Sequence, residues 1–289
     1  MKKVLVLFCL LIAAKTIAQT SCCSIPITIG TASTEIFAGL THDKKFVAAH
    51  LEPTPFILQN PIGSEIFFST PDGKDATAYM VKAKKTNKFL FVIHEWWGLN
   101  DYIKQEAERL FKSLDSVTVI ALDLYDKNVA TSRDSAAKYM QAVKTERANA
   151  IIDGAIATVN LFAGQIKKKP VIATIGWCFG GGWSMQASLR AKNMARACVM
   201  YYGMPEEKQE KIKTLNAPVL FIWPEQDQWI TKEVVSKFEA NMKTAKKSLE
   251  TKKYKADHAF ANPSNPKYNK EFADDAFKNA IEFFKKHLK

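Results

Sequence analysis

The sequence predicts an α/β fold in which a mostly parallel sheet is covered by helices on both faces, and two observations predict it. Short apolar segments typical of buried strands alternate with amphipathic segments that are long enough for helices. Such alternation implies right-handed crossovers between parallel strands. The length of 289 residues, with 47% apolar residues and no evident internal repeat, suits one domain of ordinary α/β size with an N-terminal extension.

The expected sheet begins with a hairpin. Residues 65–69 and 76–81 have the composition of strands, and Pro71-Asp72-Gly73 between them is a turn signal. The segment 89–94 is almost entirely apolar, as expected of a strand that is buried on both faces. The remaining strands are predicted at 117–124, 171–176, 197–202, 218–223 and 249–254.

Helices are predicted between these strands. Asn100 and Asp101 are good helix starters and precede the first of them. The predicted helices are 102–114, 132–143, 147–162, 182–192, 232–245 and 272–287. Residues 19–64, in contrast, contain four prolines and no sustained period. We therefore expect them to form a partly ordered extension that wraps around a domain of residues 65–289.

Residues 1–18 are predicted to be a signal peptide. Met1-Lys2-Lys3 supplies a positive start, residues 4–14 form an apolar run, and Lys15 ends it. Small residues precede a cleavage position after Ala18, so the chain is expected to be exported to the periplasm or secreted. The apolar run is too short to span a bilayer comfortably, so no stable membrane span is expected. A retained membrane anchor and a lipoprotein acylated on Cys22 are the alternatives.

Five cysteines occur, and Cys9 would leave with the signal peptide. An oxidising compartment permits disulfides, and the four other cysteines allow three pairings. Cys22 and Cys23 lie near the expected mature N-terminus. There they could pair with another segment or another chain, or remain idle thiols.

The formal charge of +12 favours anionic surfaces or ligands in general. The lysines are nevertheless scattered over expected helix ends and turns, and no zinc-finger or RNA-binding motif accompanies them. Nucleic acid is therefore not expected as a partner. The spacing of cysteine, histidine and acidic residues suggests no metal site.

A sharp turn with a potential nucleophile follows the predicted strand 171–176. Residues 176–181 read Gly-Trp-Cys-Phe-Gly-Gly, which fits the G-x-nucleophile-x-G elbow with Cys178 where serine is commoner. Glycines are needed because the chain turns so tightly that a Cβ would collide with neighbouring backbone. The backbone N–H of Phe179 is then placed to meet an oxyanion, and the start of the next helix favours a thiolate.

A carboxylate and a histidine follow in the order that this elbow requires. Asp227 lies just past one apolar strand, and His258 lies just past the last predicted strand. A nucleophile, an acid and a histidine after successive strands is the chain order of the α/β-hydrolase fold. We therefore predict that His258 takes the thiol proton and that Asp227 orients its ring. Glu225 and Asp257 are the local competitors for the role of the acid.

Another carboxylate is expected at the same edge of the sheet. Glu95 follows the strand 89–94 and is flanked by Trp96 and Trp97, so poor solvation should raise its pKa. The backbone N–H of Trp96 is placed to be the second oxyanion donor. The histidines for which we find no matching partners are assigned to the surface or to packing: His42, His50 and His287.

These motifs resemble those of the dienelactone hydrolase family, over about residues 65–289. The resemblance rests on Glu95-x-x-Gly98-Leu99-Asn100, Gly176-x-Cys178-x-Gly180-Gly181, Asp227 in its loop, and Ala256-Asp257-His258-Ala259-Phe260. It implies a Cys–His–Asp triad without a cofactor. It further implies that the glutamate, here Glu95, holds the resting thiol and takes up its proton when substrate binds.

The resemblance also implies an arginine that binds the carboxylate of the substrate, and Arg133 is its counterpart by position. The aromatic residues that accompany this arginine in the family have no clear match, since Ala137 and Met140 stand nearest. The resemblance therefore predicts the class of reaction better than it predicts the substrate.

The resulting expectation is a hydrolase of small, anionic esters or lactones that works through a thioester acyl-enzyme. Cleavage of peptides or polymeric esters would need an open groove. The alternative from another class is a non-catalytic binding or surface-associated protein built on a hydrolase fold. The complete set of Cys178, His258 and Asp227 argues against that alternative.

Overall fold

The computed structural model describes residues 32–289. The predicted signal peptide, and the predictions for Cys22 and Cys23, fall outside the described residues. Within the described part of the chain, no helix is both long and apolar enough to cross a membrane. The two cysteines of this part, Cys178 and Cys198, are free thiols and both are buried.

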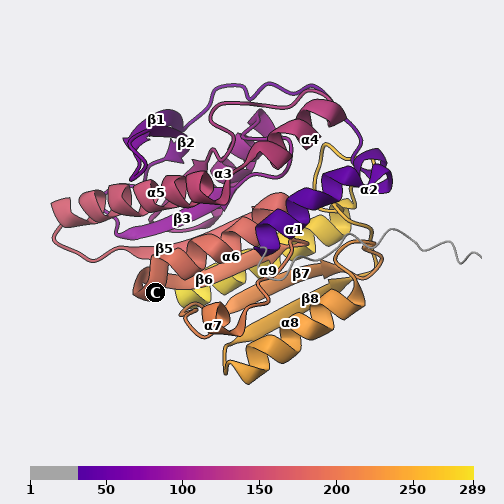
Figure 1. Cartoon of the computed structure of the whole chain (residues 1–289). Helices are drawn as coiled ribbons and strands as arrows, with labels where there is room; N and C mark the ends of the chain where they lie inside the picture. The colour runs from indigo at the N-terminus through magenta and orange to yellow at the C-terminus, as the bar shows by residue number, and fades with distance from the viewer. Residues whose placement is uncertain (1–31) are drawn as a thin grey trace, which may run out of the picture. The chain divides into compact units, whose positions relative to one another are not determined.

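An eight-stranded sheet organises the described residues (Figure 1). Its strands are β1 (Ser64–Ser69), β2 (Asp75–Val81), β3 (Lys88–Ile93), β4 (Val117–Leu122), β5 (Val171–Trp177), β6 (Ala195–Tyr201), β7 (Val219–Pro224) and β8 (Leu249–Tyr254). Their order across the sheet is β1-β2-β4-β3-β5-β6-β7-β8. The β1–β2 and β2–β4 pairs are antiparallel and the others are parallel, so the predicted hairpin and mostly parallel sheet are confirmed.

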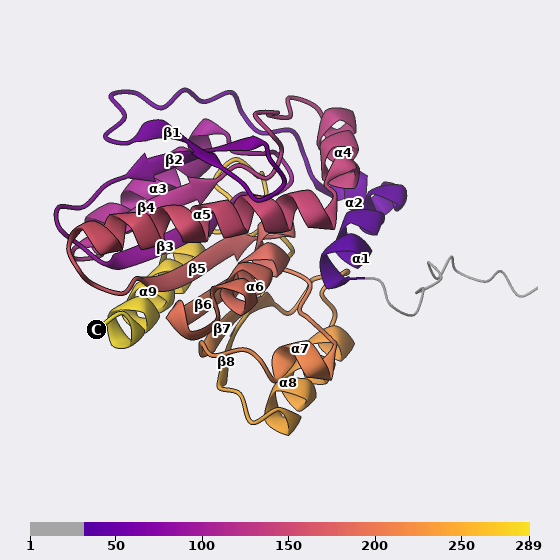
Figure 2. The same cartoon turned by 60° about the vertical axis from the view of Figure 1, so that its left-hand side comes forward.

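Helices cover both faces of the sheet (Figures 1 and 2). They are α3 (Asp101–Ser113), α4 (Arg133–Ala142), α5 (Thr145–Gln165), α6 (Phe179–Ala191), α7 (Gln209–Ile212), α8 (Lys232–Thr244) and α9 (Lys270–His287). On one face, α3 meets α9 where the guanidinium carbon of Arg109 lies 3.6 Å from the centre of the Phe277 ring. On the other face, an ion pair between Arg190 and Asp153 joins α6 to α5.

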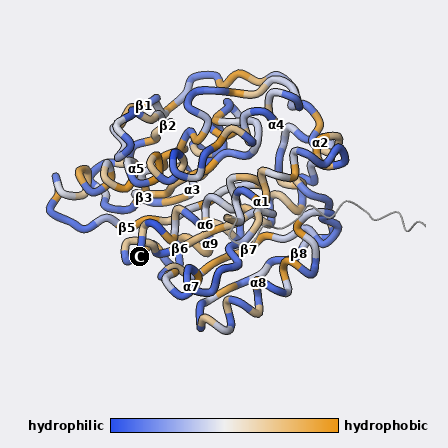
Figure 3. The backbone as a smooth tube through the Cα atoms, in the orientation of Figure 1, coloured by the Kyte–Doolittle hydropathy of each residue, from blue (hydrophilic) through white to orange (hydrophobic). Residues whose placement is uncertain are grey.

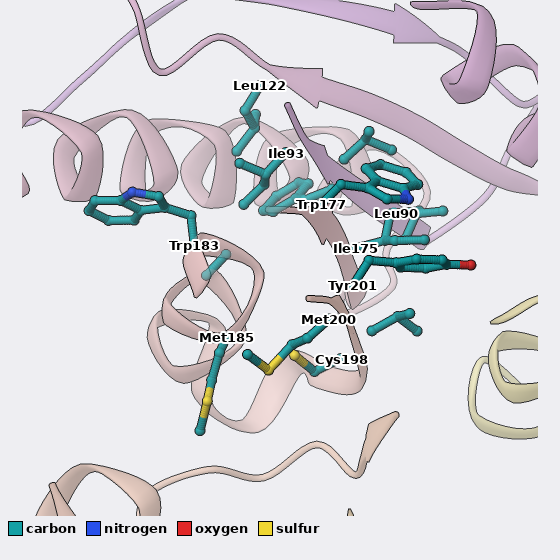
Figure 4. Packing of buried hydrophobic residues seen from close by; sticks show 14 of the residues in the cluster. Leu90, Ile93, Leu122, Ile175, Trp177, Trp183, Met185, Cys198, Met200 and Tyr201 are labelled. Carbon is teal, nitrogen blue, oxygen red and sulfur yellow. The ribbon is translucent and has the colours of Figure 1, made fainter. Parts of the chain in front are cut away.

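The apolar core lies against the central strands. Figure 3 shows apolar stretches along strands such as β5 and β7, whereas α8 alternates between polar and apolar residues. Figure 4 shows the buried side chain of Met200 on the side of Met185 and Trp183 of α6, whereas the buried side chains of Leu90 and Ile175 lie on the other side of the strands. Each fully buried aliphatic side chain contributes about 1.5–3 kcal/mol of transfer free energy, so these strands form a rigid base for the loops that follow them.

The N-terminal extension contains helices that the sequence did not predict. They are α1 (Ser33–Gly39), the 3-10 turn η1 (Leu40–His42) and α2 (Lys44–Ala49). The Asp43 side chain accepts a hydrogen bond from the Lys45 backbone N–H, which caps α2. These helices are too short to show a clear period, so their burial against the domain decides their formation. We call residues 33–50 the capping segment. It contacts α4 and α6 (Figures 1 and 2).

Candidate active site

The four predicted site residues that follow strands meet at one edge of the sheet. Glu95 follows β3, Cys178 follows β5, Asp227 follows β7 and His258 follows β8. The carboxyl ends of parallel strands share one edge, so a loop after each strand brings its side chain to the same place. All four residues are buried. The capping segment lies over them through ring contacts of Phe46 with Trp96 and His258.

Cys178 stands at a sharp turn between β5 and α6. Its φ of 55° and ψ of −120° are a backbone conformation that few non-glycine residues adopt. A Cβ on Gly176 would lie 2.0 Å from the Gly180 carbonyl oxygen, and one on Gly180 would lie 2.3 Å from the His94 carbonyl oxygen. Both positions therefore require glycine, as predicted. α6 begins at Phe179 rather than at 182, so Cys178 occupies the N-cap position of the helix.

Asp227 is the carboxylate that contacts His258. The Nδ1 nitrogen of His258 lies 2.6 Å from Oδ2 of Asp227. The other oxygen, Oδ1, accepts hydrogen bonds from the backbone N–H groups of Trp229 and Ile230 at 2.9 and 3.0 Å. These bonds fix the carboxylate, which in turn leaves Nε2 of His258 as the nitrogen free to exchange a proton.

The two local competitors for the role of the acid lie elsewhere. Glu225 is exposed to solvent. Asp257 pairs with Lys267, whose Nζ lies 3.0 Å from Oδ2. Neither carboxylate contacts the His258 ring among the described residues, so the choice of Asp227 over them agrees with the geometry.

The charges in the site raise the proton affinity of the His258 ring. Burial alone would lower the pKa of His258, but the carboxylate of Asp227 and the nearby Cys178 sulfur outweigh it and raise that pKa above its ordinary value. Burial raises the pKa of the Cys178 thiol, while His258 and the Phe179 backbone N–H favour its thiolate. The ring therefore has the proton affinity of a base that can take a proton from the thiol.

The sulfur of Cys178 lies between two imidazole rings. Its Sγ atom is 3.7 Å from Nε2 of His50, and the ligating atoms of Cys178, His50 and His258 all lie within 4.8 Å of one another. Nε2 of His258 is buried and makes no hydrogen bond with any described residue. The sulfur thus contacts His50, and His258 acts on the same sulfur from within 4.8 Å.

His50, Cys178 and His258 also offer the only group of three ligating side chains in the described residues that could hold a metal ion. Imidazole nitrogens and a thiolate are ligands that Zn²⁺ accepts. The sequence indicated no such group, because His50 lies far from the other two along the chain. A metal ion bound here would coordinate the Cys178 sulfur, so the sulfur could not attack a substrate.

Glu95 is buried next to the same residues. Burial raises its pKa to about 7, although a side-chain hydrogen bond from Asn262 and the charge of His258 act in the opposite direction. Its Oε2 atom is buried and has no hydrogen-bond partner in the described part of the chain. No hydrogen bond joins Glu95 to the sulfur there, and the contact that the family resemblance assigns to Glu95 is made by His50 in this structure.

The raised pKa of Glu95 predicts a pH-dependent stability difference between the wild-type protein and Glu95→Gln. Between pH 4.5 and about 7 the folded state holds the Glu95 proton more tightly than the unfolded state. The contribution of Glu95 to the free energy of unfolding therefore falls as the pH rises through this window, by up to about 3 kcal/mol. Glutamine carries no charge and avoids this loss.

Urea unfolding at pH 5 and pH 8 measures this difference. We expect Glu95→Gln to gain about 2–3 kcal/mol relative to the wild-type protein between the two pH values. An equal difference in unfolding free energy at pH 5 and pH 8 would show that Glu95 ionises normally in the folded protein.

Of the two backbone donors predicted for an oxyanion, the Phe179 N–H lies against the sulfur. The Trp96 backbone N–H makes no hydrogen bond among the described residues, and the Trp96 ring packs 4.5 Å from the His50 ring, centre to centre. Both residues are buried. This arrangement suits a role for both N–H groups toward a developing oxyanion.

Arg133 is not part of this group. Its Nε atom lies 3.7 Å from an oxygen of Glu52, and the residue lines a cavity of about 300 Å³ with Thr41 and Lys44. A different cavity, of about 340 Å³, reaches His258 and His50. Lys45, Lys267 and Asp257 line this second cavity, and Lys267 pairs with Asp257, so the rim keeps a net positive charge from Lys45. Arg133 and His258 therefore line different cavities.

Sequence reasoning missed two residues of this site. His50 was assigned to the surface or to packing, because no motif surrounds it; it is buried and contacts the sulfur. Asn262 follows His258 by four residues, and its Oδ1 accepts from the Ser264 backbone N–H at 2.8 Å, which aims its amide at Glu95. Its place in the Ala-Phe-Ala-Asn segment after His258 was the available signal.

The fold and the nucleophile turn define the class of this protein as an α/β-hydrolase. A family model described as the dienelactone hydrolase family matches residues 76–288. The chain belongs to that family and is therefore a hydrolase of ester or lactone bonds. The capping segment lies before the matched region.

Known proteins agree with this assignment. A protein of Aquifex aeolicus (strain VF5) with a provisional assignment as a carboxymethylenebutenolidase is 25% identical, over 75% of this chain and 96% of its own length. A carboxymethylenebutenolidase of Pseudomonas sp. (strain P51) is 30% identical, over 45% of this chain and 54% of its own. A crystal structure of a provisionally assigned dienelactone hydrolase from Klebsiella pneumoniae has a similar fold, with a TM-score of 0.64, 21% identity, and coverage of 78% and 99%.

Proposed function

We propose that the protein hydrolyses small esters or lactones with Cys178 as nucleophile, His258 as base and Asp227 as the residue that orients His258. The observation that carries this proposal is the 2.6 Å contact of His258 Nδ1 with Asp227, with an unpartnered Nε2 on the side of the sulfur. This pattern matches the geometric roles of a triad, in which the acid fixes the ring and the free nitrogen exchanges protons.

The reaction begins when the thiol proton passes to Nε2 of His258. The Cys178 sulfur then forms a bond to the carbonyl carbon, and the N–H groups of Phe179 and Trp96 stabilise the oxyanion. The carbon–oxygen bond of the ester breaks, and the leaving oxygen takes the proton from His258. A water molecule next gives a proton to His258 and attacks the thioester. The carbon–sulfur bond breaks, and the thiol regains its proton.

The polar lining supports a small, oxygen-rich substrate. The hydroxyl groups of Tyr125 and Tyr202 are buried and have no hydrogen-bond partner among the described residues. Both hydroxyl groups lie within electrostatic reach of Cys178 and Glu95. A substrate that accepts or donates hydrogen bonds there would remove the cost of leaving them unpaired, which is about 1–3 kcal/mol each.

We also propose a preference for anionic substrates. Lys45 at the cavity beside His258 supports it, because positive charge at the entrance raises the local concentration of anions, whereas the charge of Lys267 there is paired with Asp257. The names of the carboxymethylenebutenolidase relatives support the same class, since a carboxymethyl group is anionic at neutral pH. Arg133 could take part only after its ion pair with Glu52 opens.

Export, as inferred from the first 18 residues, remains part of the proposal.

Capture of the acyl-enzyme tests the proposed function. The full mature chain is mixed with matched pairs of short acyl esters and lactones, one neutral and one with a carboxylate. We expect turnover, with a transient mass increase equal to the acyl group on the Cys178 peptide that hydroxylamine removes. Turnover without an adduct on Cys178, or an adduct on another residue, would contradict the mechanism. Complete inertness toward the panel would instead favour a binding protein.

A further inference from the structure

The capping segment carries aromatic and polar side chains directly onto the nucleophile. Phe46 and His50 are both nearly inaccessible to solvent, and the Cys178 beneath them is 0% exposed. The Phe46 ring lies 4.2 Å from the His50 ring and 5.1 Å from the Trp229 ring, centre to centre. The segment thus completes the wall of the site with residues that lie outside the region matched by the family.

The hydrogen bonds of His50 fix which of its nitrogens faces the sulfur. Nδ1 lies 2.7 Å from the Phe46 carbonyl oxygen, and only a protonated Nδ1 can donate to a carbonyl. Nε2 of a neutral ring is then a lone-pair acceptor, and it lies 3.7 Å from Sγ of Cys178. The thiol is therefore the donor and His50 the acceptor.

The surroundings keep His50 neutral. Burial, together with the effect of a charge on His258, lowers the pKa of His50 to about 3, although the Phe46 carbonyl and Asp227 act in the opposite direction. The titratable groups that face this ring are Cys178, His258 and Asp227. A ring with so low a proton affinity accepts the hydrogen bond of the thiol but does not take its proton. It cannot replace His258 as the base.

The two imidazoles compete for one thiol proton. A hydrogen bond from the neutral thiol to His50 stabilises the neutral form and so opposes thiolate formation. His258 has a free Nε2 within 4.8 Å of the same sulfur. We propose that His50 is an additional active-site residue, which accepts the thiol hydrogen bond of Cys178 and holds the nucleophile in its resting state until substrate displaces it.

Displacement is sterically required because His50 stands against the atom that must attack. A carbonyl carbon that approaches Sγ needs the space that the His50 ring now fills. The capping segment is held to the domain by the buried rings of Phe37 and Phe46 and by a few polar contacts. The polar contacts are Thr41 with Gln141, Glu35 with Thr145, and Asp43 with Trp229. These polar contacts are exposed or half-buried, so each contributes little, and the main resistance to displacement of His50 is the packing of the buried rings.

This inference rests on the proposed function, because it assumes that Cys178 is the nucleophile. Its test follows the alkylation of Cys178 by iodoacetamide in the full mature chain, read on the Cys178 peptide by mass spectrometry between pH 6 and pH 10. Only the thiolate reacts, so the midpoint of the rate against pH reports the thiol pKa. The plateau at high pH reports access to the sulfur.

Two substitutions separate the hydrogen bond from the shielding. His50→Phe keeps a ring of similar size but removes the acceptor, so we expect a midpoint at lower pH and a plateau near that of the wild-type protein. His50→Ala removes both, so the plateau should rise as well. At pH 7 the rate should increase about tenfold for each pH unit by which the midpoint falls. His42→Ala is the matched control, because His42 is an exposed histidine of the same segment.

Midpoints of His50→Phe and His50→Ala that equal the wild-type midpoint would overturn the proposal. If neither variant folds, the wild-type protein still decides: a midpoint below that of an ordinary cysteine, about pH 8.5, means that the thiol is not held neutral. The assay needs no turnover. Shifted midpoints in a chain that hydrolyses no ester would refute the proposed function alone, and turnover with unshifted midpoints would refute the role of His50 alone.

Discussion

Replacement of Cys178 by alanine is expected to lower kcat for a short ester by about 10⁴-fold or more, because it removes the atom that we propose forms the thioester. The residual rate would come from the oxyanion donors and from substrate binding, which do not depend on the sulfur. Initial rates with a chromogenic ester, measured beside a circular dichroism spectrum of each variant, give this comparison. The substitution leaves a small buried gap, so folding has to be checked together with activity.

Cys198→Ala is the matched control for this experiment. Cys198 is a buried cysteine on β6, and its sulfur lies 3.7 Å from Oγ of Ser184 rather than near the catalytic residues. The same loss of a sulfur from the core should therefore leave kcat unchanged. If Cys178→Ala keeps most of the wild-type rate while Cys198→Ala behaves identically, the nucleophile has been misassigned.

Asp227→Asn is expected to have the second-largest effect, a fall in kcat of about 10³- to 10⁴-fold. The carboxylate now accepts from Nδ1 of His258 at 2.6 Å, which leaves Nε2 unprotonated in the neutral ring. An amide that presents its NH₂ group would favour the opposite tautomer and would also remove the charge that raises the pKa of His258. The pH profile of kcat/KM should therefore lose the limb due to His258.

The competing carboxylates supply the controls for Asp227. Glu225→Gln and Asp257→Asn remove one negative charge each from neighbouring positions but break no contact with the His258 ring. Both variants should keep the wild-type pH profile. A large loss of activity in Asp257→Asn together with an active Asp227→Asn would move the role of the acid to Asp257.

The site contains two histidines whose pKa values move in opposite directions. Burial dominates at His50 and keeps it neutral, whereas the carboxylate of Asp227 outweighs burial at His258. Groups whose environments separate their pKa values in this way commonly take different roles in proton transfer. The separation supports His258 as the base and His50 as an acceptor that only holds the thiol.

The positions of the strands, and of the site residues that follow them, could be predicted from the sequence because their signals are local. The apolar runs of β3, β4 and β5 mark strands that are buried on both faces, and the glycines around Cys178 mark a turn that tolerates no Cβ. The nucleophile, acid and histidine follow successive strands, so parallel topology alone brings them to one edge. Asp227 was preferred over Glu225 on the same ground.

The helices of the capping segment could not be predicted from local sequence patterns. α1 and α2 are short, have no long period, and form because Phe37 and Phe46 are buried by residues far along the chain. The place of Arg133 likewise depends on its ion pair with Glu52 of the extension, a contact between distant segments. No local pattern encodes such contacts.

The amino-acid sequence by itself determined the positions of the strands along the chain, the turn at Cys178 and the succession of Asp227 and His258, because each depends on neighbouring residues and on the rule that parallel strands end together. Only the tertiary structure decided that His50 rests against the sulfur. That contact joins residues 50 and 178, which are far apart along the chain. It forms because both side chains are buried where the capping segment packs on the domain, and no local sequence pattern encodes it.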